Sequence, residues 1–354
     1  MAGRRRDPGA ITVIVTVLRD PRVRETLASL AGQTRAPAQI LVADGGGADG
    51  EVRRIAEAAR ARDPRIVWLD APGTIAESRN RALASVTSEF VAFLDADEVA
   101  PPGWLDALTR PFADPTVGFT GGPTPAAAGT VRGAGVRYYD AYLRRFYDEV
   151  ARRRPTSLPM GNSAWRAEVF DRVGPLDTTL YPRASSEDQE YARRVVEAGW
   201  KGLYVAEASV VHDFSDLTTA KILAKQSRYA LGGFVVWRRT GSTYEASGGR
   251  LAPYVLLPAI AVIGGIVSLF PGGRLAGALL AGVGLAGLGL LALGLTMQGL
   301  AWDRRYPGMR YRAFEILRRW ATLLGAARGL RRYGWSGRRG LPSSPPAPPP
   351  SGKP

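Results

Sequence analysis

Two aspartates separated by a single residue, Asp95 and Asp97, are the first candidates for chemistry in this sequence. They follow the apolar run EFVAFL (89–94), a pattern that predicts a buried strand. In an extended chain, side chains two residues apart point to the same side, so both carboxylates would converge on one hard cation. A divalent cation bound to a diphosphate neutralises it and makes it a leaving group. The D-x-D spacing alone is a weak signal, because acidic residues are common in turns.

A second acidic pair, Glu187-Asp188, stands at the start of the helical pattern DQEYARRVVEAG (188–199). The helix dipole favours a carboxylate there, so the pair is either a plain helix cap or a candidate general base. His212, the single histidine, follows the strand-like run YVAEASVV (204–211) and is either a packed structural residue or a ligand. The chain has no cysteine, which excludes thiolate catalysis and cysteine-ligated metals.

A glycine-rich loop follows the strand-like run QILVAD. The stretch QILVADGGGADG (39–50) places Gly45, Gly47 and Gly50 at the G-x-G-x-x-G spacing of a dinucleotide-binding loop. Asp44 stands against that interpretation, because its carboxylate would repel a pyrophosphate at the strand tip. From this loop alone, a nucleotide-related role and an ordinary glycine-rich turn both remain open.

Strand-like runs alternate with amphipathic helix patterns from residue 10 to about residue 100. The runs span 11–18, 39–44, 65–70 and 89–97, and the helix patterns span 22–32, 51–62 and 74–86. This βαβα rhythm predicts a parallel sheet covered by helices, with ligands at the carboxyl ends of the strands, where Asp44, Asp70 and Asp95 lie. Residues 115–160 read as irregular, apart from an arginine-rich helical stretch at 138–155.

Two uncharged runs, 251–270 and 275–302, reach the length of a bilayer span and are separated only by a short turn. We therefore expect a two-span transmembrane hairpin over 251–302, with a buried hairpin of a soluble protein as the alternative. Arginines concentrate on the outer flanks, so the positive-inside bias places both flanks in the cytoplasm. Small residues along the second run offer a packing surface for the first span, another protein or lipid: Ala278, Gly282, Ala286 and Gly294.

Basic segments lie on both sides of the expected hairpin. Residues 216–250 and 303–340 mix cationic with apolar and aromatic residues, as interfacial amphipathic helices do; helices packed on the domain are the alternative. The formal net charge of +15 gathers around them, which favours membrane lipids over nucleic acid as partner. Composition predicts a disordered proline-rich tail at 341–354. Near the N-terminus, three arginines precede the apolar run 11–18, which reads as a buried first strand and not as the core of a signal peptide.

Taken in order, these motifs resemble those of the family 2 glycosyltransferases over roughly residues 10–215. The shared order is an opening strand, a strand ending in Asp44, the Asp95/Asp97 pair, the segment GN…R…F…VG…LD (161–177), the Glu187-Asp188 pair and a strand ending in His212. The resemblance implies the GT-A fold, an α/β architecture with a mostly parallel sheet and helices on both faces. It also implies that residues 1–215 form a domain that uses a nucleoside-diphosphate sugar as donor and a divalent metal, Mg²⁺ or Mn²⁺, as cofactor.

The same resemblance implies roles for the residues on the donor side. Asp44 would contact the base or ribose of the nucleotide. Asp95 would lie at the donor and, with Asp97, hold the metal on its diphosphate, while His212 would complete the metal site. Asp20 is a nucleotide contact by position only, because TVLRDP replaces the asparagine and acidic residue of many relatives.

On the acceptor side, the resemblance implies that Asp188 is the general base, with Glu187 as its neighbour in the catalytic pair.

Two arginines belong to the donor side again. Arg79 and Arg81 are placed like residues that line the donor site in relatives, a less specific inference. The mechanism implied is a direct displacement that inverts the anomeric configuration.

The region after the catalytic domain resembles, more loosely, the membrane-attached succinoglycan-type exopolysaccharide glycosyltransferases. Processive synthases carry Q-x-x-R-W, whereas this chain has Gln226-Ser227-Arg228-Tyr229, one residue short, which favours single addition. We therefore expect transfer to a lipid-linked or other glycan acceptor at the cytoplasmic membrane. A polyprenyl-phosphate sugar synthase and a non-catalytic membrane adaptor with the same fold remain the alternatives.

Overall fold

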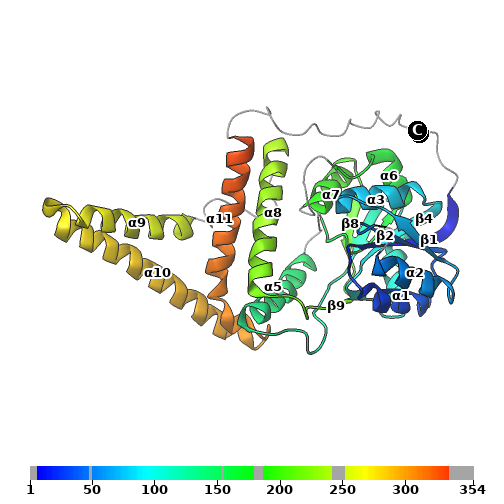
Figure 1. The fold of residues 1–354 in the computed structure, drawn as a ribbon, viewed down its shortest axis with the longest axis horizontal. Helices are drawn as coiled ribbons and strands as arrows, with labels where there is room; N and C mark the ends of the chain where they lie inside the picture. Colours follow the sequence, from blue (N-terminus) through cyan, green and yellow to red (C-terminus); the bar gives the residue numbers. More distant parts are fainter. Residues whose placement is uncertain are drawn as a thin grey trace. The chain divides into compact units, whose positions relative to one another are not determined.

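The computed structural model describes residues 6–47, 50–152, 155, 157–178, 186–240 and 252–334 (Figure 1). The chain divides into two compact units. The first consists of Met1–Thr130, Phe146–Phe214 and Pro342–Pro354, and the second of Val131–Arg145 and Ser215–Leu341. The predicted tail at 341–354 and part of the 216–250 segment lie outside the described residues.

The first unit is built on a seven-stranded sheet in the order β3-β2-β1-β4-β7-β6-β8. Its strands are β1 (Asp7–Val17), β2 (Gln39–Asp44), β3 (Ile66–Asp70), β4 (Ser88–Asp95), β6 (Val117–Gly121), β7 (Asn162–Arg166) and β8 (Lys201–Tyr204). The four strands from the first half of the chain are parallel, as expected. β7 runs antiparallel to both β4 and β6, so the sheet is mostly and not wholly parallel.

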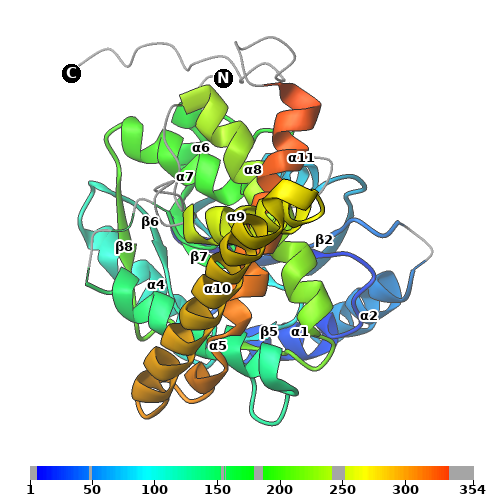
Figure 2. The same cartoon turned by 90° about the vertical axis from the view of Figure 1, so that its left-hand side faces the viewer.

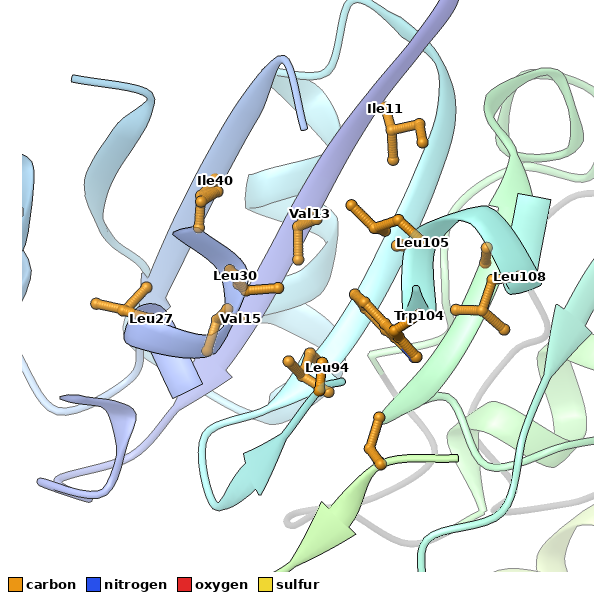
Figure 3. Close-up of a cluster of buried hydrophobic side chains, with 14 of the residues drawn as sticks. Ile11, Val13, Val15, Leu27, Leu30, Ile40, Leu94, Trp104, Leu105 and Leu108 are labelled. Carbon is orange, nitrogen blue, oxygen red and sulfur yellow. The ribbon is translucent and has the colours of Figure 1, made fainter. Parts of the chain in front are cut away.

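Helices cover both faces of this sheet. One face packs against α1 (Val23–Ala31), α2 (Glu51–Arg60) and α4 (Trp104–Thr109), and the other against α3 (Ile75–Ala84), α6 (Ala167–Val173) and α7 (Glu187–Glu197). The strand period of two explains this division, since Val13 and Val15 enter one core and Ile14 the other. Figure 3 shows the first core, where Trp104 of α4 lies near Leu94 of β4. Burying each such side chain contributes about 1.5–3 kcal/mol.

Two expectations about the second half of this unit were wrong in detail. Residues 204–211 do not form one strand; β8 ends at Tyr204 and a separate two-residue strand, β9 (Val211–His212), follows. β9 pairs antiparallel with β5 (Glu98–Val99), so the histidine arrives beside the acidic pair through a small second sheet. In the segment 115–160, the expected helix is present as α5 (Ala134–Val150), but strand β6 was not expected from the irregular composition.

The second unit consists of helices. It contains the first part of α5 with α8 (Thr219–Thr240), α9 (Ala252–Ser268), α10 (Arg274–Asp303), the short 3₁₀ helix η4 (Met309–Tyr311) and α11 (Phe314–Tyr333). Figures 1 and 2 show α8 beside α11 and α9 beside α10, pairs that the residue contacts confirm. A Cβ on Gly325 would lie 2.1 Å from the Ser227 carbonyl oxygen, so only glycine lets α8 and α11 approach this closely.

A buried polar network joins three helices of this unit. The Arg318 guanidinium donates to both Glu315 oxygens at 2.8 and 2.9 Å and to Gln226 Oε1 at 3.2 Å. Gln226 in turn donates to Thr322 Oγ1 at 3.2 Å, and the Tyr138 hydroxyl of α5 bonds Glu315. The Gln226 side chain is therefore committed to helix packing.

Helices α9 and α10 form the expected hairpin, packed through glycine. A Cβ on Gly264, Gly277 or Gly284 would lie 2.2–2.4 Å from backbone nitrogen of the facing helix. Of the small residues named from the sequence, Gly282 and Gly294 do not make this contact, because a Cβ on either would have nothing within 4 Å. In the described part of the chain, α10 with its preceding turn is the one helix long and apolar enough to cross a bilayer, while α9 is shorter.

Candidate active site

Asp95 and Asp97 lie where β4 ends and the chain turns into β5. The Asp95 amide donates to the Gly161 carbonyl at 3.0 Å, which fixes the turn against the start of β7. A Cβ on Gly161 would lie 2.3 Å from Asp95 Oδ2, so the absence of a side chain there makes room for the carboxylate. The Asp95 side chain keeps 38% of its surface exposed and is therefore available to a ligand.

The pairing of β5 with β9 brings His212 to Asp97. Its Nε2 lies 3.0 Å from Asp97 Oδ2, and its Nδ1 lies 3.6 Å from the buried Glu98. Arg22, from the start of α1, lies 3.6 Å from the same Asp97 oxygen and also holds Asp20 at 2.6 Å. Burial opposes ionisation of Asp97, but His212 and Arg22 hold the pKa of its carboxyl below the usual range.

Arg79 is the buried centre of the second cluster. From α3 it reaches Glu187 Oε1 at 3.1 Å and Asp95 Oδ1 at 3.5 Å, across 108 residues of sequence in the first case. Both Arg79 and Glu187 are buried, and the Arg79 Nε has no hydrogen-bond partner. The guanidinium thus links Asp95 of the first acidic pair to Glu187 of the second. Arg81 lies apart from it, exposed and bonded to the Pro72 carbonyl.

Asp188 lies in the first turn of α7, as the sequence predicted for the pair. Its Oδ1 accepts the Gln189 amide at 2.8 Å, a bond that orients the carboxylate. Burial raises the pKa of Asp188 above its usual value, the Arg79 charge opposes that rise and the Asp95 charge adds to it. A raised pKa brings a carboxylate nearer to the range in which a general base works at neutral pH.

Asp44 lies beneath the glycine turn, and its carboxylate is fully buried. Its oxygens accept the Gly46 amide at 2.7 Å and the Trp68 indole N–H at 3.1 Å. Arg19 covers the turn in a left-handed backbone conformation, with φ 53°, and a Cβ on Gly46 would lie 2.9 Å from its Cγ. Such strain in a non-glycine residue is typical of functional loops. Asp44 therefore forms a cluster of its own, at the carboxyl end of β2.

Sequence reasoning missed several residues that hold this site together. Asn80, next to Arg79, donates to the Leu176 carbonyl at 2.8 Å and accepts the Leu176 amide at 3.0 Å. Arg79 and Asn80 are consecutive in α3. Asn80 fixes the chain at Leu176, before the acidic pair, and Arg79 fixes it at Glu187. Arg22 and Glu98 were not singled out either, because no local pattern marks a residue whose role depends on contacts with distant segments.

The donor atoms at Asp97 and His212 suit a divalent cation. Carboxylate oxygen and imidazole nitrogen are ordinary ligands of such ions, and Mg²⁺ is commonly held by one or two carboxylates together with substrate phosphates. Within the described ranges, no three acidic or histidine side chains form a ready metal cluster. Asp97 and His212 are thus two side chains that could contribute ligands to such an ion.

A mostly parallel sheet with one reversed strand, an acidic pair after the fourth strand and a second acidic pair opening a late helix define a GT-A glycosyltransferase. The model of the family described as "Glycosyltransferase like family 2" matches residues 8–231, more than half of the chain. The chain belongs to this family.

Two named relatives extend this finding. The chain is 30% identical over 218 residues to a pre-mycofactocin glycosyltransferase of Mycobacterium tuberculosis, covering 58% of this chain and 45% of that one. It is 36% identical over 103 residues to a succinoglycan biosynthesis protein of Rhizobium meliloti, covering 28% and 33%. The chain thus spans about half or less of the length of these relatives.

A solved structure supports the fold. A mannosyltransferase from Pyrobaculum calidifontis, in complex with GDP-Man and Mn²⁺, superposes with a TM-score of 0.56 at 18% identity. The match covers 90% of this chain and 86% of that one. At this identity the likeness establishes the architecture alone.

Proposed function

We propose that this glycosyltransferase moves a sugar from a nucleoside-diphosphate donor to a hydroxyl of a membrane-associated, polyprenyl-linked glycan, with inversion at the anomeric carbon. The observation that supports this proposal best is the chain of contacts from Asp95 through Arg79 to Glu187. It joins the start of α7, which carries Glu187 and Asp188, to Asp95 and so supports an acceptor base close to the donor. Asp188, next in sequence, is then the group positioned to meet an acceptor hydroxyl.

In the proposed reaction, the Asp188 carboxylate takes the proton of the acceptor hydroxyl while that oxygen attacks the anomeric carbon. The bond from that carbon to the diphosphate oxygen breaks on the opposite face, and its electron pair leaves with the nucleoside diphosphate. Arg79 lies close enough to Asp95 to add positive charge beside the departing diphosphate. Glu187, buried and paired with Arg79, holds that guanidinium in place, so we assign it a positioning role.

A divalent cation, Mg²⁺ or Mn²⁺, held by Asp97 and His212 with Asp95 nearby would neutralise charge on the leaving diphosphate. The Mn²⁺ in the Pyrobaculum calidifontis mannosyltransferase complex supports this part of the proposal. For the nucleotide end we propose the glycine turn over Asp44, with Arg19 exposed to the phosphates or ribose. Asp20 is engaged by Arg22, so we propose that it acts by orienting this arginine.

We further propose that α9 and α10 insert as a hairpin in the cytoplasmic membrane, with the catalytic unit on the cytoplasmic side. The apolar length of α10 and the arginines beyond both ends of the hairpin support this placement. The basic helices α8 and α11 are then at the membrane surface, where they face anionic lipid.

The decisive experiment measures sugar transfer and donor binding by the purified chain and by its Asp188→Asn variant. Loss of the general base lowers kcat by about 10²–10⁴-fold, while the affinity for the nucleoside diphosphate stays within about twofold. Asp97→Ala should instead abolish the metal dependence of nucleotide binding. If Asp188→Asn keeps most of the transfer rate, the acceptor is a lipid phosphate, which needs little base catalysis, and the hydroxyl proposal is wrong.

A further inference from the structure

Trp302, at the end of α10, lies between two arginines from different elements. The guanidinium carbon of Arg145, on α5, is 4.2 Å from the Trp302 ring centroid, and that of Arg312, after η4, is 4.8 Å from it. All three residues belong to the second unit. Guanidinium groups stack on indole rings through cation–π attraction, and a stacked guanidinium keeps its N–H edge directed outward.

The surroundings of this cluster are strongly cationic. Residues 302–319 hold six arginines and two carboxylates. Both carboxylates are committed elsewhere, Asp303 to the Gly308 and Arg310 amides and Glu315 to the buried network with Arg318. Two guanidinium groups against one ring repel each other, so an anion close to both of them is favoured.

Arg312 also has an N–H group without a hydrogen-bond acceptor. Its Nε is buried and has no hydrogen-bond partner, and its Nη1 reaches only the Met309 sulfur, at 3.9 Å. A buried N–H without a partner is costly, and a phosphate oxygen is a strong acceptor for a guanidinium edge. The Arg312 Nε therefore lacks an acceptor of the kind that a phosphate supplies.

The position of the cluster indicates where that phosphate comes from. The uncharged run of α10 ends at Trp302, and Leu293, Met297 and Leu300 just before it are exposed apolar side chains. Tryptophan at such a boundary lies at the level of lipid headgroups, and basic pockets there bind phosphate-bearing lipids. A ligand with both an apolar chain and a phosphate can contact the exposed apolar side chains of α10 with the first and the two arginines with the second.

We propose that Arg145, Trp302 and Arg312 form a binding site for the phosphate group of a membrane lipid, separate in sequence from the catalytic residues. The proposal rests on the membrane placement of α10 in the proposed function. It requires that the two arginines act together, because both guanidinium groups lie against the same indole ring.

The test compares the full chain in detergent with Arg145→Gln/Arg312→Gln and with Arg331→Gln/Arg332→Gln. The second variant removes the same charge from the exposed end of α11, where Arg332 lies over its own neighbour Tyr333, and serves as the matched control. Binding of undecaprenyl phosphate, phosphatidic acid and phosphatidylcholine is measured by native mass spectrometry, with inorganic phosphate as competitor. We expect at least a tenfold loss for both phosphomonoester lipids in the first variant and less than twofold in the control.

Any outcome other than this selective loss of lipid binding contradicts the proposal. Equal losses in both variants mean a diffuse basic surface, and no loss in either means that the arginines serve packing alone. Competition by millimolar inorganic phosphate means a site for a soluble anion. The single substitutions Arg145→Gln and Arg312→Gln, each expected to lose about threefold or more, keep the test valid if the double variant does not fold. Nucleoside diphosphate binding, measured in parallel, tests the donor site independently, so failure of one proposal is distinguishable from failure of the other.

Discussion

Replacing Glu187 by alanine should destabilise the catalytic unit at one identifiable point. Arg79 is 3% exposed and Glu187 is 5% exposed, and their 3.1 Å contact is a buried ion pair. Removing one partner of such a pair costs about 3–5 kcal/mol, because a buried charge is left without compensation. Asp95 remains 3.5 Å from the same guanidinium, so we expect the lower end of that range, about 3 kcal/mol.

Hydrogen exchange in the native state is the suitable assay, because a chain with two units need not unfold in one step. A loss of about 3 kcal/mol accelerates exchange of the most protected α3 and α7 amides roughly 100-fold. Glu197→Ala is the matched control on α7, since its exposed pair with Arg193 contributes only about 0.3–0.5 kcal/mol. Acceleration of less than threefold, or no more than in the control, would refute the assignment of Glu187 as the buried anchor of Arg79.

Three further predictions concern the supports of the site and of the helical unit. Asn80→Ala removes two hydrogen bonds to the Leu176 backbone. It should lower the free energy of unfolding by about 2–3 kcal/mol and kcat by about tenfold, and leave the KM for the donor unchanged. An altered KM with a normal kcat would contradict this prediction. Gly161→Ala should displace the Asp95 carboxylate and weaken nucleoside-diphosphate binding about tenfold, measured by calorimetry, with folding retained. Burial opposes ionisation of Glu315, yet Arg318 and its neighbours lower the pKa of this carboxyl to about 2, from 4.5. Its stabilising contribution, about 3 kcal/mol, is thus fully present above pH 4.5 and is lost as pH falls toward 2; Glu315→Gln should flatten this part of the stability profile.

The sequence predicted the elements that repeat a simple period. β2 begins and ends at the expected residues, Gln39 and Asp44, because a fully buried strand between turns leaves a clear apolar run. The acidic pair at the start of α7 was also placed correctly, since helix termini attract carboxylates. The reversed direction of β7 had no such signal, because strand direction depends on the connection and not on side-chain alternation.

What the sequence could not predict are contacts between distant segments. The meeting of Asp97 with His212 depends on pairing between two strands of two residues each, too short to show a period. Asn80 resembles any polar residue on a helix surface, and its bonds to Leu176 bridge 96 residues. The glycines that pack the α9–α10 hairpin were not the ones spaced most regularly along the chain, because the facing helix decides which small residue is needed.

The pairing of α8 with α11 sets an order of events during synthesis. Gln226 finds its partner Thr322 only 96 residues later, and the whole α9–α10 hairpin lies between them. At translation rates of roughly 5–20 residues per second, the polar face of α8 is synthesised about 5–20 s before α11, the helix that covers it. The hairpin must therefore reach its final environment before α11 emerges, and a chain that stops after α10 would leave that face uncovered, as a target for chaperones and proteases.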